Sequence, residues 1–137
     1  MSAEAVIYAL LAGAGPVTAI VGDRIYPEFL PLDKALPALV YDQISRVERN
    51  AVSLAQPTVK VVSRIQVTAL VPEKAYPQKK ALLAAVRAAC ANRLGTIAGV
   101  ADVTTDAGTW GPDLRDAELA ISSQSIDFMV TFNQAAA

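Results

Sequence analysis

The sequence predicts an α+β fold: a mainly antiparallel sheet of about four strands with an N-terminal helix and one long helix packed on one face. Two observations indicate it. Residues 59–71 and 120–132 alternate apolar and polar side chains with the period of a half-buried strand. Residues 73–95 carry the strongest helical pattern of the chain. The expected order is one or two short helices, two strands, the long helix and two more strands.

Length and composition fit a single domain, which we expect to cover residues 1–137. A chain of 137 residues is close to the common size of a domain with one hydrophobic core. Apolar residues make up 53% and charged residues 18% of the sequence, which argues against intrinsic disorder. The chain should therefore fold, and its apolar excess suits a surface that is partly covered by partners.

The first expected element is a short helix. Four apolar side chains lie on one face at helical spacing: Val6, Ile7, Leu10 and Leu11. Ser2 is a candidate N-cap, and Glu4 lies in the first turn, where the helix dipole favours an acidic side chain. Glycines and a proline in residues 13–16 end this helix. Residues 17–21 then form a second short helical segment.

An irregular arm and two strands should follow. The prolines in residues 23–37 fix their own φ and keep the preceding residues out of the helical region. Residues 38–47 are predicted to form a strand, and residues 59–71 a more regular one. The second strand has an apolar and a polar face: Val59, Val61, Ile65, Val67 and Ala69 against Lys60, Arg64, Gln66 and Thr68. The connection at residues 46–58 is too long for a tight turn and is typical of a functional or mobile loop.

The long helix should bury one apolar stripe and end at Gly95. The stripe consists of Leu83, Val86, Cys90 and Leu94, widened by Leu82 and Ala89. Residues 99–105 form a short strand candidate, and residues 106–118 a polar, turn-rich loop. The last strand should place four side chains inward: Ile126, Phe128, Val130 and Phe132. Its other side chains, Ser125, Asp127, Met129 and Thr131, should point outward.

The residue types that most enzymes need are missing. The chain has no histidine, so the commonest general base and zinc ligand is absent and a Ser-His-Asp triad cannot be built. The only cysteine, Cys90, lies among alanines and is expected to be a buried, inert thiol. No glycine motif for dinucleotide or nucleotide binding occurs. We therefore expect no catalytic residue, no cofactor and no enzymatic activity.

Five carboxylates gather in the sequence near the last hairpin: Asp102, Asp106, Asp113, Asp116 and Glu118. Carboxylates can hold magnesium or calcium, but this spacing matches no EF-hand loop and Arg115 interrupts it. A solvated, turn-forming loop explains the segment better. We expect no metal site, although a metal-dependent enzyme that uses this loop is an open alternative.

Charge and hydropathy point away from nucleic acid and membranes as main partners. The formal net charge is -1, which gives no general attraction for phosphate backbones or anionic lipid. The apolar run near the start, "AVIYALLAGAG", is too short to span a bilayer and follows Glu4 rather than a basic leader. A single cysteine also excludes an internal disulfide, which fits synthesis in a reducing compartment.

Each of two loops has both a purely structural and a functional interpretation. Trp110 lies between glycine-containing turns, where its ring either packs back onto the core or is an exposed anchor for another subunit. Arg46, Glu48 and Arg49 form either a solvated charge run or contacts between identical subunits. Composition alone does not decide between these interpretations.

Three stretches together resemble one protein family. They are "VGDRIYP" at residues 21–27, "PALVYDQIS" at residues 37–45, and "RIQV" at residues 64–67 followed by the helical residues 76–90. In their order, spacing and total length they resemble the tail-completion or tail-terminator proteins, also called tail-to-head joining proteins, of long-tailed bacteriophages, prophages and gene transfer agents. The resemblance extends to Leu94, and the C-terminal hairpin fits only in its general pattern.

The resemblance implies a structural virion protein: a hexameric ring that caps the tail tube and joins the tail to the head. Its implied partners are further copies of itself, the tail tube protein and a head-side connector or stopper protein. DNA would pass through the ring, without sequence-specific nucleic-acid binding and without membrane binding. The implied location is the head-tail interface of the virion, after synthesis in the host cytoplasm.

We expect the subunit and partner interface to use residues of the loops: Asp23, Arg24, Tyr26, Phe29, Arg46, Glu48, Arg49, Trp110, Asp113 and Arg115. The proline-stiffened arm would lose little entropy on docking, but it could equally serve to cover a sheet edge. An alternative from another class is a small α+β ligand-binding or regulatory module that holds a metabolite between helix and sheet.

Overall fold

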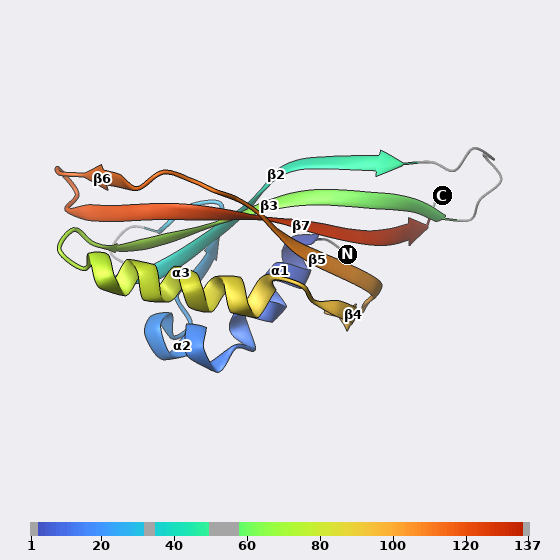
Figure 1. The fold of residues 1–137 in the computed structure, drawn as a ribbon, viewed down its shortest axis with the longest axis horizontal. Coiled ribbons are helices and arrows are strands. Elements are labelled where there is room, and N and C mark those ends of the chain that lie inside the picture. The colour runs from blue at the N-terminus through green and yellow to red at the C-terminus, as the bar shows by residue number, and fades with distance from the viewer. Residues whose placement is uncertain (1–2, 32–34, 50–57, 136–137) are drawn as a thin grey trace.

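The computed structural model describes residues 3–31, 35–49 and 58–135, and side chains as far as residue 134. The helices and strands follow along the chain as shown in Figure 1: α1 (Ala3–Ala12), α2 (Gly15–Val21), β1 (Ile25–Pro27), β2 (Ala38–Arg49), β3 (Thr58–Pro72), α3 (Tyr76–Cys90), β4 (Leu94–Ile97), β5 (Val100–Trp110), β6 (Leu114–Asp116) and β7 (Ile121–Ala135). The candidate N-cap Ser2 lies outside the described residues.

The described strands form one seven-stranded sheet in the order β1-β2-β3-β7-β5-β4, with β6 paired to β7. All pairs are antiparallel except β1 with β2. The mixed α and β fold is therefore confirmed, but the prediction of about four strands is wrong. The additional strands β1, β4 and β6 have three or four residues each, too few to display a period of two.

The two longest strands, β3 and β7, lie side by side at the centre of the sheet with the predicted alternation. Their apolar side chains point to one face, here called the inner face, where Ile65, Val67, Phe128 and Val130 are fully buried. Figure 1 shows the helices on this side of the sheet. The opposite, outer face carries the side chains predicted as polar or outward, such as Arg64.

The helices bury the predicted apolar stripes except for Leu94 and, in part, Leu10. Val6, Ile7 and Leu11 of α1 are fully buried. The stripe of α3 is also buried, but α3 ends at Cys90 and Leu94 is 80% exposed in β4. The prediction that the helix extends to Gly95 is therefore wrong. Within the described residues no single helix is long and apolar enough to span a membrane; α1 and α2 together pass that test by length and composition, at an angle of 82°.

Strand β5 is longer than predicted. Residues 106–110 belong to β5, and Leu114–Asp116 forms β6, so much of the predicted loop at residues 106–118 is paired with β7. Gly108 suits this place because a Cβ there would lie 3.1 Å from the Asp127 carbonyl oxygen. A glycine reads as a turn signal in isolation, but here it allows close approach of two strands.

Candidate functional site

Arg24 holds the Gly-Asp-Arg turn after α2. Its Nε donates to the Pro37 carbonyl oxygen at 2.8 Å and its Nη2 to the Ile20 carbonyl oxygen at 3.3 Å. The Leu39 N–H donates in turn to the Arg24 carbonyl oxygen at 2.9 Å. Arg24 therefore ties the end of α2 to the start of β2 within one chain. The neighbouring Asp23, which was also predicted to be an interface residue, is exposed.

Phe29 is presented to solvent by a fixed backbone. The residue is 66% exposed, and its N–H donates to the Pro27 carbonyl oxygen at 2.7 Å. The preceding Glu28 donates its N–H to the Tyr41 carbonyl oxygen of β2 at 2.9 Å. Tyr26, in β1, is half-buried. Of the two predicted aromatic anchors, Phe29 has the larger free surface; residues 32–34 of the same arm lie outside the described residues.

Arg46, Glu48 and Arg49 lie on β2 rather than in a loop, because β2 continues through Arg49. Arg46 Nη2 contacts Glu48 Oε1 at 3.3 Å and donates to Gln134 Oε1 at 2.5 Å. Arg49 is directly opposite Lys60 of β3. The loop prediction at residues 46–49 is therefore wrong, and the rest of that connection, residues 50–57, lies outside the described residues.

Two lysines of α3 join Asp113 to the first turns of that helix. Lys79 is 1% exposed, and its Nζ lies 2.8 Å from both the Asp113 carboxylate and the Ser122 hydroxyl. Lys80 Nζ donates to the same carboxylate at 2.9 Å. Hydrogen bonds from Lys79 and then Lys80 lower the pKa of the Asp113 carboxyl. This predicted interface residue anchors the segment between β5 and β6 to its own chain.

Trp110 and Arg115 lie on either side of that anchor. Trp110, at the end of β5, is 43% exposed, so its ring is neither fully packed nor fully free. Arg115 Nε contacts Glu73 Oε1 at 3.1 Å. Such an exposed pair contributes little to stability, about 0 to 1 kcal/mol. Both side chains therefore remain available to a partner.

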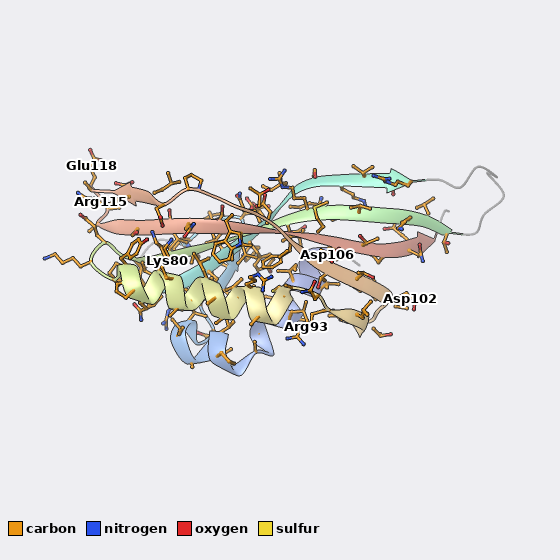
Figure 2. The ribbon with its side chains drawn as sticks, viewed as in Figure 1. Lys80, Arg93, Asp102, Asp106, Arg115 and Glu118 are labelled. Carbon is orange, nitrogen blue, oxygen red and sulfur yellow. The ribbon has the colours of Figure 1, made fainter. Side chains whose placement is uncertain are left out.

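The carboxylates of residues 102–118 do not gather in space. Figure 2 shows Asp102 and Asp106 on the β5 side and Glu118 at the opposite end of the molecule, near β6. Asp116 accepts the N–H groups of Glu118 and Leu119 at 3.0 and 3.1 Å, which shapes a turn. In the part of the chain that the structure describes, no group of three or more acidic or cysteine side chains is placed to hold a metal ion.

Asp127 is a polar residue whose environment the sequence did not indicate. It points to the outer face as predicted, yet it is only 3% exposed. Arg64 of β3 covers it, donating from Nε to Asp127 Oδ2 at 2.6 Å, and Arg64 Nη2 contacts the same oxygen. The two residues are 63 positions apart, so only the sheet register brings them together.

The surfaces offer little to the ligand-binding alternative. The space between helix and sheet, where that alternative would hold a metabolite, is filled by fully buried side chains such as Ile65, Leu83 and Phe128. A hollow of about 290 Å³ lies on the outer face instead, where the β6 hairpin meets the end of β3. It is open, and its lining is mostly leucine and isoleucine: Leu70, Leu114, Leu119 and Ile121.

Cys90 has no features of a nucleophile. It is fully buried at the end of α3, and burial raises the pKa of its thiol to about 12. Its carbonyl oxygen accepts the Thr105 hydroxyl at 2.5 Å, which joins α3 to β5. The expected burial of the thiol is confirmed.

Comparison with known proteins gives one family and one fold. The family model described as "Tail completion protein gp17" matches residues 5–133. A search of curated proteins finds no match. A solved chain from the structure described as "Virion of native gene transfer agent (GTA) particle" superposes with a TM-score of 0.75 at 15% identity, covering 97% of this chain and 96% of that chain. At that identity the likeness is one of fold alone.

Proposed function

The chain belongs to the tail completion protein gp17 family, and from this premise we propose that it is a tail terminator, a ring of copies that caps the finished tail tube and joins the tail to the head. Membership confirms the family resemblance of the sequence and supports a virion location. The family is structural, so the proposed role is one of shape and association, without an enzymatic step.

The observation that carries the proposal is the exposed C-terminal half of β2. Residues 43–49 are exposed on both faces, and among the described strands they pair with β3 alone. Ile44 and Val47 in this segment are 47% and 50% exposed. Open edge strands with apolar side chains are normally protected or covered by a partner. A copy that covers this edge with a different surface of its own makes a heterologous contact, and such a contact repeated by rotation closes a ring.

The proposed partners follow from the ring. Six copies would present one side to the tail tube protein and the other to a head-side connector or stopper protein, with DNA passing through the middle. Phe29 and Trp110 are exposed aromatic side chains of the type that anchors interfaces. The net charge of -1 gives no general attraction for DNA, which suits a conduit that does not retain it.

Polymerisation of the tail tube protein of the same virion, with and without the purified chain, tests this function. We expect the chain to bind one end of each tube and to stop its growth, measured as tube length by electron microscopy. The variant Ile44→Lys with Val47→Lys should fold but fail to cap tubes. Leu94→Lys, at a side chain that is 80% exposed on β4, is the control. Tubes that grow equally long with and without the chain would contradict the proposal.

A further inference from the structure

A polar row crosses the outer face of the sheet. Asp42 of β2, Gln66 of β3 and Asp127 of β7 are register neighbours, so their side chains point to the same face. A β-bulge lies on each side of the row: Ile44 is the extra residue in β2, and residues 108–109 oppose Asp127 from β5. Bulges re-aim side chains and recur next to functional sites.

Asp127 has one oxygen without a partner. Both contacts from Arg64 fall on Oδ2, and Oδ1 is buried with no hydrogen-bond partner within the described part of the chain. The carboxylate is 4% exposed, whereas the Arg64 side chain is 42% exposed. A buried carboxylate oxygen without a donor is unfavourable. Arg64 therefore compensates Asp127 only in part.

Further negative charge surrounds Asp42, which shares the polar row with Asp127. Burial, the Asp127 carboxylate and the Glu28 carboxylate, in that order, raise the pKa of Asp42. Asp42 forms no ion pair among the described residues. Asp42, Asp127 and Glu28 thus act on one another, and of these three carboxylates only Asp127 has an ion-pair partner among the described residues, so this part of the sheet has an excess of negative charge.

A matching positive pair lies at the end of the β2-β3 hairpin. Arg49 and Lys60 are direct register partners, both are exposed, and neither forms an ion pair within the described residues. Like charges placed directly opposite each other are destabilising. Lys60 lies on the same outer face as Gln66, but six positions along a strand separate them by roughly 20 Å. The Arg49 and Lys60 cations therefore cannot reach the acidic row of their own copy.

We propose that the outer-face carboxylate of Asp42 in one copy, in the same row as the buried Asp127, receives the Arg49 and Lys60 cations of a neighbouring copy. This contact rests on the proposed ring and names the surfaces that join its subunits. The hairpin end and the acidic row are different parts of the chain, so the contact is heterologous and passes from copy to copy around the ring. It relieves the like-charge repulsion on one copy and the negative excess on the next.

Charge reversal tests the contact in capped tubes. Arg49→Glu with Lys60→Glu should lower the fraction of capped tube ends about tenfold or more, because close charge pairs in interfaces couple by about 1.5 kcal/mol or more. Asp42→Lys should do the same, and the triple variant should restore capping. Lys74→Glu with Arg87→Glu makes the same change in net charge at exposed positions outside both surfaces, and should leave capping unchanged.

Each outcome of these experiments either supports or overturns the proposed contact. Normal capping by Arg49→Glu with Lys60→Glu overturns the contact and leaves the terminator function intact, whereas wild-type chain that never caps tubes removes both. Loss of capping without rescue in the triple variant also overturns the pairing. Should Asp42→Lys fail to fold by circular dichroism, Asp42→Cys with Arg49→Cys replaces it. Oxidation must then yield a ladder of linked copies on tubes, and a product of single copies overturns the contact.

Discussion

Arg64 is the cation on which the burial of Asp127 depends, and Arg64→Met measures that dependence. Methionine keeps much of the apolar volume but removes both donors to Asp127 Oδ2. Removing one partner of a fully buried ion pair costs about 3 to 5 kcal/mol. Because the Arg64 side chain is 42% exposed while Asp127 is 4% exposed, water can replace part of the lost contact. We therefore expect a loss of about 2 kcal/mol in the free energy of unfolding.

Urea unfolding of the purified chain at neutral pH, followed by circular dichroism, is the assay. Arg46→Met is the matched control, since its partner Glu48 is 52% exposed and exposed pairs contribute about 0 to 1 kcal/mol. The double variant Arg64→Met with Asp127→Asn should recover part of the loss because it removes the unpaired buried charge. An Arg64→Met loss no larger than that of Arg46→Met would refute this account of the outer face. So would a double variant that is less stable than the wild type by the sum of the two single losses.

Three further predictions use other residues. Asp42→Asn should raise the melting temperature of the single copy at pH 7, because the folded state raises the pKa of Asp42 above its ordinary 3.8, so ionised Asp42 destabilises the fold above the raised pKa. That gain should shrink as the pH falls through the raised pKa towards 3.8, and a gain independent of pH would be inconsistent with this cause. The Cys90 thiol should react with a thiol reagent only on unfolding, because burial raises its pKa to about 12; rapid labelling of folded protein would contradict its burial. Phe128→Ala should cost about 3 to 5 kcal/mol of unfolding free energy, whereas Phe29→Ala, at a side chain 66% exposed, should leave stability nearly unchanged and weaken tube capping; a Phe29→Ala chain that caps normally would exclude that side chain as an anchor.

The elements that the sequence predicts well are those with a long, regular pattern. Strands β3 and β7 have 15 residues each, enough for the period of two to identify the buried face. The short strands β1, β4 and β6 exist because a neighbouring strand offers hydrogen bonds, which is a property of the assembled sheet. Gly108 lies in β5 for the same reason, although glycine is depleted in strands. Trp110 favours strands by type, but the glycines around it made its segment resemble a turn.

The candidate site was less predictable because most of its contacts join distant parts of the chain. Arg24, Arg46 and Asp113 were selected as interface residues from their loops, yet each has a partner within its own chain. Their contribution to an interface stays a prediction. The sequence did not indicate the burial of Asp127, because an acidic residue at an outward strand position is normally solvated. A polar residue opposite a glycine bulge is the one pattern that could have drawn attention to it.

Electron microscopy of particles made with this gene deleted, beside a complemented control, tests the central claim most directly. A terminator that stops tube growth and joins the tail to the head predicts overlong or ragged tails separated from filled heads, with normal particles in the control. Normal tailed particles in the deletion strain would contradict the proposed function.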